Sequence, residues 1–127
     1  MTPSSILLVE DDRDIREALV EALTDAGYDV HSAVDGLDAL EQLQAAAALP
    51  HLIVLDLMMP RMNGAEFRQA ILAEERLKGI PVLLLTADAQ ARAKAEALDV
   101  AGYLRKPVKL ADLFRAVASS ITPRSES

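Results

Sequence analysis

One stretch of sequence decides the fold: Leu52-Ile53-Val54-Leu55-Asp56-Leu57-Met58-Met59-Pro60. Its first four residues form a continuous apolar run, which is typical of a strand buried on both faces. Asp56 ends this run just before a turn, so its carboxylate is expected at the edge of a sheet. A second run, Ile6-Leu7-Leu8-Val9, ends in the acidic cluster Glu10-Asp11-Asp12. Two strands that each end in acid predict one shared site.

Composition limits the classes of protein to which this chain can belong. Its 127 residues are enough for one domain with a core, and 51% of them are hydrophobic. The net charge of −7 argues against a nucleic-acid-binding surface. The chain has no cysteine, which excludes a disulfide, a cysteine-ligated zinc and a thiol nucleophile. Because it has neither a signal-peptide pattern nor an apolar stretch near the roughly 20 residues that span a bilayer, we expect a soluble, cytoplasmic protein.

Strand-like and helix-like segments alternate along the chain. Strands are expected at residues 5–9, 28–33, 51–56, 82–85 and 102–105. Helices are expected at residues 13–26, from 36 to the alanine tract at 45–48, from 64 to 79, at 88–98 and at 110–121. Strands joined by helices run parallel, with helices on both faces of the sheet. The pattern predicts a doubly wound (βα)5 domain of class α/β.

In an open parallel sheet, ligands bind outside the carboxyl ends of the strands. The polar residues at these ends are Glu10, Asp11, Asp12, Asp56 and Thr86, with Lys106 just past the fifth strand. Carboxylates that converge repel each other unless a cation neutralises them, and oxygen ligands suit Mg2+. The two histidines, His31 and His51, are expected at the opposite ends of their strands. The sequence therefore predicts a magnesium site built from carboxylates.

In such a site Asp56 can also act as a nucleophile. Beside a metal, a lysine and a threonine, its carboxylate can attack a phosphoryl group and hold it as an aspartyl phosphate. The metal and Lys106 would offset the negative charge of the transferred group. The hydroxyl of Thr86 could donate a hydrogen bond to a phosphoryl oxygen.

The chain resembles the receiver domain of two-component response regulators, a CheY-like family. The resemblance rests on four motifs in order, Val9-Glu10-Asp11-Asp12, Asp56-Leu57-Met58-Met59-Pro60 with Asn63-Gly64, Leu85-Thr86-Ala87, and Tyr103-Leu104-Arg105-Lys106-Pro107. It covers a receiver domain at residues 4–121 and leaves a polar tail at 122–127. It implies a flavodoxin-like five-stranded sheet with the strand order 2-1-3-4-5.

The resemblance also implies a role for each matched residue. Asp56 would be the phosphoacceptor, and Lys106 would pair first with Asp56 and then with the phosphoryl group. Asp11 would bind Mg2+ directly, Glu10 would act on it through water, and the backbone carbonyl of Met58 would be a further ligand. The peptide bond that follows Lys106 is usually cis in this family.

The family also implies a switch and its partners. The hydroxyl of Thr86 would move to the phosphoryl group, and the ring of Tyr103 would turn inward into the space that it leaves. A histidine kinase or a histidine phosphotransfer protein would supply the phosphoryl group. A downstream protein would bind the surface formed by the fourth helix, the fifth strand and the fifth helix. The domain would bind neither nucleic acid nor membrane, and would catalyse only its own phosphorylation and slow autodephosphorylation.

Two positions depart from the family pattern, and one region points to a subtype. Asp99 stands where the family commonly has glycine, so the turn after the fourth helix is expected to be strained or reshaped. Lys109 replaces a small polar or acidic residue at the start of the last helix and predicts a weak cap. The sequence from Lys106 to Leu113 resembles stand-alone receivers, or those attached to kinases, more than receivers joined to winged-helix domains.

Other interpretations of the same residues remain open. Asp12 could serve only as a helix cap, and Tyr103 could be a half-buried strand residue that does not rotate. A haloacid-dehalogenase-type phosphatase also uses an aspartate after a strand, but it needs a second aspartate where this chain has Met58. A phosphate sink or shuttle without an output partner is a third possibility. If Asp56 is phosphorylated, the bulk of Met58 should hinder attacking water and predicts slow hydrolysis.

Overall fold

A computed structural model describes residues 3–59 and 61–121. Five parallel strands form one sheet in the order β2-β1-β3-β4-β5. The strands are β1 (Ser5–Val9), β2 (Asp29–Ala33), β3 (Leu52–Asp56), β4 (Val82–Thr86) and β5 (Gly102–Arg105). The helices are α1 (Arg13–Asp25), α2 (Gly36–Ala45), α3 (Gly64–Leu72), α4 (Ala91–Leu98) and α5 (Leu110–Ser120). The expected α/β fold, its parallel sheet and the order 2-1-3-4-5 are confirmed.

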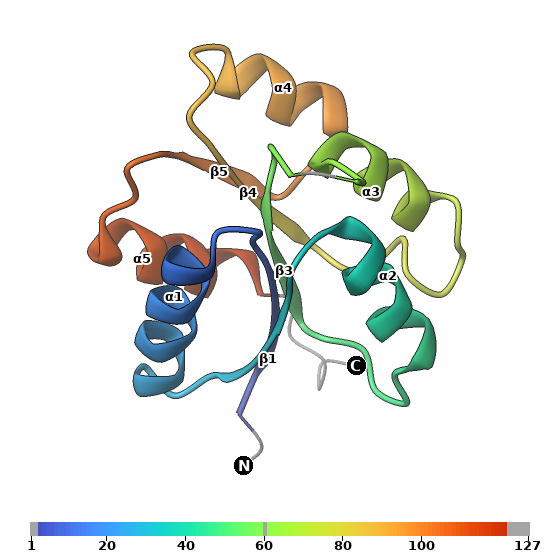
Figure 1. Cartoon of the computed structure of the whole chain (residues 1–127), viewed down its shortest axis with the longest axis horizontal. Coiled ribbons are helices and arrows are strands. Elements are labelled where there is room, and N and C mark those ends of the chain that lie inside the picture. Colours follow the sequence, from blue (N-terminus) through green and yellow to red (C-terminus); the bar gives the residue numbers. More distant parts are fainter. Residues whose placement is uncertain (1–2, 60, 122–127) are drawn as a thin grey trace.

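The sheet is covered on both faces, as Figure 1 shows, with α1 and α5 on one side and α2, α3 and α4 on the other. The central strand β3 explains this arrangement, because all five of its residues are buried. Its alternate residues Ile53 and Leu55 pack on the side of α2, α3 and α4. Leu52 and Val54 pack on the side of α1 and α5. A strand buried on both faces needs the continuous apolar run seen in the sequence.

Side chains cap the first three helices. Asp12 accepts a hydrogen bond from the amide of Ile15 at 3.0 Å, so the expectation that it could cap α1 is confirmed. Asn63 and Glu66 form a reciprocal capping box at the start of α3. Lys109 makes no side-chain capping bond at α5, as expected, because a lysine side chain has no acceptor for the free amides of a helix start.

Helix α3 is shorter than the sequence predicted, because it ends at Leu72 instead of continuing to Gly79. The chain then turns, with the amide of Leu77 bonded to the carbonyl of Glu74 at 3.0 Å. Leu77 is fully buried in the same cluster as Ile71. Six residues along one continuous helix would place it about 120° away from the face of Ile71. Burial of both side chains therefore favours the turn over the longer helix.

Two smaller predictions were also wrong. Helix α4 begins at Ala91 and not at residue 88, because Asp88 forms a turn in which its carboxylate accepts from the amide of Gln90 at 2.7 Å. His31 lies at the centre of β2, paired with Leu7, and not at the beginning of that strand. His51 does directly precede β3, as expected.

The turn after α4 has the left-handed backbone that its sequence predicted. Asp99 has a φ of 54°, a conformation that costs a non-glycine residue about 1–2 kcal/mol. The buried guanidinium of Arg68 on α3 donates to the carbonyls of Leu98 at 2.9 Å and Asp99 at 2.6 Å. These two bonds stabilise the strained end of α4. Within residues 3–59 and 61–121, no helix has both the length and the apolar character needed to cross a bilayer.

Candidate functional site

The carboxyl ends of β1 and β3 bring three carboxylates together. One carboxylate oxygen from each of Glu10, Asp11 and Asp56 lies within 4.8 Å of the others. Glu10 and Asp56 are 1% and 3% exposed, whereas Asp11 is exposed to solvent. A site with two buried walls and one open side admits a hydrated cation. The sequence correctly predicted that these three residues would meet.

Lys106 supplies the positive charge in this cluster. Its Nζ atom lies 3.2 Å from Oδ1 of Asp56 and 3.5 Å from Oε1 of Glu10. Its amide donates to the carbonyl of Thr86 at 2.8 Å, which fixes the start of the loop after β5. The Lys106–Pro107 peptide is cis, as the family resemblance implied.

Burial and like charge both act on the two buried carboxyl groups. Burial raises the pKa of Glu10 to about 7; the negative charge of Asp56 also raises it, while the amide of Asp12 and the charge of Lys106 oppose the shift. Burial likewise raises the pKa of Asp56 above its ordinary value, against the opposing charge of Lys106. Burial lowers the pKa of Lys106, but the carboxylates outweigh it, so the net pKa is raised and the lysine stays charged. One lysine does not neutralise the carboxylates.

The donor set fits a hard divalent cation such as Mg2+. Oε1 of Glu10 is buried and has no hydrogen-bond donor among the described residues, although Lys106 lies at ion-pair distance. A buried oxygen without a donor is costly, and a metal ion or a water bound to it would supply the missing partner. The other oxygen of Glu10 accepts from the amide of Asp12 at 3.1 Å.

Thr86 and Tyr103 lie on neighbouring strands near this cluster. Thr86 is 1% exposed, and its hydroxyl oxygen accepts a hydrogen bond from the amide of Asp88 at 3.0 Å. Tyr103 is 37% exposed and lines a hollow on the α4–β5 surface together with Arg92 and Val100. The hydroxyl is therefore held inside the sheet edge, while the aromatic ring is accessible from outside.

Two further residues shape the site, of which Gly64 was part of a quoted motif and Arg16 was not singled out from the sequence. Arg16 on α1 donates to the carbonyls of Glu10 at 3.0 Å and Asp11 at 3.3 Å, and so holds the acidic turn in place. A Cβ on Gly64 would lie 2.8 Å from Cα of Leu57, so only glycine lets α3 start this close to the end of β3. No sequence pattern indicated the role of Arg16, because a side chain that reaches back five and six residues to backbone carbonyls leaves no motif.

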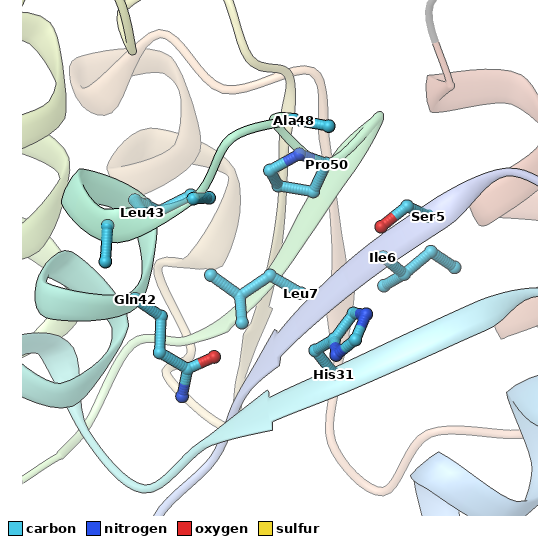
Figure 2. Close-up of a pocket in the computed structure, with 10 residues that line it drawn as sticks. Ser5, Ile6, Leu7, His31, Gln42, Leu43, Ala48 and Pro50 are labelled. Carbon is cyan, nitrogen blue, oxygen red and sulfur yellow. The ribbon is translucent and has the colours of Figure 1, made fainter.

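A separate pocket of about 330 Å³ lies away from the acidic site, beside the beginning of β1 and the end of α2 (Figure 2). Ser5, His31, Leu43 and Pro50 are among the residues that line it, and Figure 2 draws them around the opening. Its lining holds no carboxylate and no lysine. The chemistry predicted from the sequence therefore belongs to the other end of the sheet.

An open parallel sheet whose strand ends gather three carboxylates, a lysine and a buried threonine defines a CheY-like class of α/β protein. A family model described as "Response regulator receiver domain" matches residues 6–118. The chain belongs to this family of two-component signalling domains.

Individual relatives agree with this assignment. RpaA of Synechocystis, described as a DNA-binding dual master transcriptional regulator, is 39% identical over 88% of this chain and 46% of its own length. The response regulator MprA of Mycolicibacterium vanbaalenii is 38% identical over 95% of this chain and 53% of its own length. The chain thus spans about half the length of these curated relatives. The solved chemotaxis protein CheY4 of Vibrio cholerae superposes with a TM-score of 0.85 at 32% identity, over 94% of this chain and 100% of that one.

The comparisons give no support to a haloacid-dehalogenase-type phosphatase. Met58, 70% exposed, occupies the position where that class needs its second aspartate. A family of phosphoacceptor domains in two-component signalling accounts for both the fold and the acidic site.

Proposed function

We propose that Asp56 is the phosphoacceptor of this domain and that its phosphorylation switches a protein-interaction surface. The observation that carries the proposal is the placement of its carboxylate, 3.2 Å from the Nζ atom of Lys106 and within one cluster with Glu10 and Asp11. A carboxylate oxygen of Asp56 would form a bond to phosphorus as the phosphorus–nitrogen bond to a donor histidine breaks. The donor imidazole takes up a proton as it leaves.

Mg2+ would be held by the carboxylates of Asp11 and Asp56, by Glu10 through water, and by the backbone carbonyl of Met58. When bound, the ion offsets the negative charge of the phosphoryl oxygens. The ammonium group of Lys106 neutralises further charge on the same group.

Thr86 and Tyr103 would pass the change outward. The Thr86 hydroxyl would leave the amide of Asp88, to which it is bonded at 3.0 Å, and donate to a phosphoryl oxygen. The ring of Tyr103 would then turn from its exposed position into the space that opens. The surface of α4, β5 and α5 would bind a downstream protein in one of these two states.

The phosphoryl donor has an apolar surface on which to dock beside the site. A hollow of about 480 Å³ is lined by Ile15, Leu19, Pro107 and Val108, and also by Lys106 of the site. Ile15 is 39% exposed although it is a large apolar residue. A helix of a histidine kinase or of a phosphotransfer protein that covered this hollow would bring its histidine next to the acidic cluster.

The receiver domain would extend over most of the chain. Residues 4–121 would form the receiver domain, while the polar tail at 122–127 lies outside the described residues. The domain would work in the cytoplasm and catalyse no turnover beyond its own phosphorylation and slow dephosphorylation. A partner that binds only the phosphorylated form in a pull-down would support the switch; capture of kinases or phosphotransfer proteins alone would favour a phosphate sink.

The direct test is intact-mass measurement after incubation with a small phosphodonor and Mg2+. We expect the wild-type chain to gain the mass of one phosphoryl group, and Asp56→Asn to gain none. The gain should disappear when EDTA removes the metal. A wild-type chain that never gains this mass would exclude the proposed function.

A further inference from the structure

The loop between β3 and α3, which follows Asp56 and carries Met58, is tied to the beginning of α2. Nε of Arg61 lies 2.6 Å and Nη2 lies 2.5 Å from the same carboxylate oxygen of Asp35. The Asp35 side chain is buried, with a relative exposure of 5%. Because the pair is short and its carboxylate is buried, it is stronger than an ordinary surface ion pair.

The two oxygens of Asp35 have different tasks. Oδ1 accepts from the amide of Asp38 at 2.9 Å and so caps α2, whereas Oδ2 binds Arg61. One carboxylate therefore joins the start of a helix to a loop that lies 26 residues further along the chain. Loss of the charge on Asp35 would break the tie to the loop while leaving a capping oxygen in place if asparagine replaced it.

The backbone of the loop is strained where the tie is made. Arg61 has a φ of 63°, in the left-handed region that costs a non-glycine residue about 1–2 kcal/mol. Such a conformation persists only when the surroundings hold it. The next residue also contacts α2, because a Cβ on Gly36 would lie 2.8 Å from Cγ of Met62 and 2.9 Å from its carbonyl oxygen. The ion pair thus holds Arg61, and close packing holds Met62, the residue after it.

The beginning of the loop, at Leu57 and Met58, is bonded to Asp56 and to the start of α3. The amide of Met58 donates to Oδ1 of Asp56 at 3.3 Å, and the amide of Gly64 donates to the carbonyl of Leu57 at 2.8 Å. The peptide between Leu57 and Met58 is thus bonded through its N–H to Asp56 and through its carbonyl to the start of α3. Arg61 and Met62 of the same loop are held against the beginning of α2.

We propose that Arg61 and Asp35 are positioning residues for the site, which hold the β3–α3 loop so that the Met58 peptide meets Asp56 and the metal. This inference rests on the proposed magnesium site. Neither residue would touch the ion or the phosphoryl group, and both would act through the loop. Removal of residues that orient ligands weakens metal binding by roughly tenfold or more.

The test measures the Mg2+ dissociation constant of the unphosphorylated chain by titration calorimetry, together with unfolding in urea. We expect Arg61→Ala and Asp35→Asn each to weaken Mg2+ binding by about tenfold. The double variant should bind no more weakly than either single one, because the two residues act as one unit. If Arg61→Ala does not fold, Arg61→Lys takes its place. It keeps the charge but loses one of the two contacts with Asp35, and it should weaken Mg2+ binding by less than Arg61→Ala.

A matched control is Arg76→Ala. Arg76 also joins the chain to α2, but at the other end of that helix, where it donates to the carbonyls of Leu43 at 3.0 Å and Ala46. Its loss should lower the free energy of unfolding and leave the Mg2+ dissociation constant unchanged.

Three results would overturn the inference in distinguishable ways. If the wild-type chain binds no Mg2+, the proposed function fails and the inference fails with it. If the wild type binds Mg2+ and the Arg61 and Asp35 variants bind equally well, only the positioning role is wrong. If Arg76→Ala weakens binding as much as Arg61→Ala does, the effect is one of general stability and the specific role is also wrong.

Discussion

The Nζ atom of Lys106 lies 3.2 Å from Oδ1 of Asp56, although 50 residues separate them in the sequence. Asp56 ends β3 and Lys106 directly follows β5, and strand β4 lies between these two strands. The same ammonium group is 3.5 Å from Oε1 of Glu10, so one cation serves two buried carboxyl groups. One ammonium group does not neutralise both carboxylates. A bound metal ion would offset the repulsion that remains between them.

Replacement of Lys106 by methionine should destabilise the metal-free protein. The change leaves two buried carboxylates without a counter-charge, which we expect to cost about 1–3 kcal/mol at neutral pH. Urea unfolding in EDTA measures this loss, and Mg2+ should restore part of it. Lys78→Met is the control, because Lys78 only pairs with the exposed Glu75 at 2.8 Å and should change stability little. Equal effects of the two substitutions would contradict the account.

The stability of the metal-free protein should increase as the pH falls through neutrality. Glu10 has a pKa of about 7 in the folded protein and 4.5 as a reference for the unfolded chain. Because the folded state holds this proton more tightly, stability rises as the pH falls from above 7 toward 4.5, and the gain is complete below that value. Urea unfolding in EDTA at several pH values measures the slope.

Glu10→Gln provides the control for that pH dependence. It removes the titrating group, so the slope between pH 7 and 4.5 should flatten and stability at pH 8 should rise on the order of 1 kcal/mol. Saturating Mg2+ should have a different effect on the wild type, because it favours the ionised carboxylates and raises stability most at high pH. A wild-type slope in EDTA that the substitution leaves unchanged would show that another group is responsible.

Asp35 should act in the opposite direction at lower pH. Burial tends to raise its pKa, but the amide of Asp38 and the guanidinium of Arg61 outweigh burial and hold the pKa below 3.8. A carboxylate with a depressed folded pKa stabilises the protein above its unfolded pKa, and this stability is lost as the pH falls through the folded value. Asp35→Asn should therefore reduce the acid-induced loss of stability below about pH 4, as followed by circular dichroism. An unchanged acid transition would contradict the strength assigned to the Arg61 pair.

Asp99→Gly should stabilise the protein by about 0.5–1 kcal/mol. Glycine adopts the φ of 54° without the steric cost that aspartate bears, although it also gains freedom in the unfolded chain. The two bonds from Arg68 go to backbone carbonyls and survive the change. Thermal unfolding of Asp99→Gly and Asp99→Ala measures the effect. If alanine stabilised as much as glycine did, relief of backbone strain would not be the cause.

Met58 should slow the loss of the phosphoryl group from Asp56. Its side chain is apolar and 70% exposed, and it lies two residues after the proposed phosphoacceptor, where it can obstruct water. Met58→Asn should shorten the lifetime of the aspartyl phosphate about several-fold, because a smaller polar side chain admits and orients water. The decay of the phosphorylated mass after the donor is removed measures this rate. An unchanged rate would exclude hindrance by Met58.

The fold and the centre of the site were predictable from sequence because their signals are local. Four apolar residues before Asp56 define a buried strand, and in a parallel sheet the end of one strand must lie beside the ends of its neighbours. Once Glu10, Thr86 and Lys106 were also placed at strand ends, the geometry of the sheet brought them together. The strand order itself came from the resemblance to a family and not from the pattern of residues.

The features that the sequence did not predict depend on contacts between distant segments. Arg61 and Asp35 each lie in a loop without regular periodicity, and nothing local indicates that they pair across 26 residues. The early end of α3 has a similar cause, because burial of Leu77 in the core is decided by tertiary packing and not by helix propensity. The misplacement of His31 was not an error of strand bounds, because the expected strand at 28–33 agrees with β2 (Asp29–Ala33) to within one residue and already holds position 31 in its interior.

The central claim is that the phosphoryl group forms on Asp56, and locating the modified residue tests it most directly. The chain would be phosphorylated with a small phosphodonor and Mg2+, reduced with borohydride to convert any aspartyl phosphate into a stable alcohol, digested, and sequenced by tandem mass spectrometry. We predict a reduced side chain at position 56, dependent on both donor and metal, and none at Asp11 or Asp12. Modification at either of those two residues with position 56 unmodified would contradict the account.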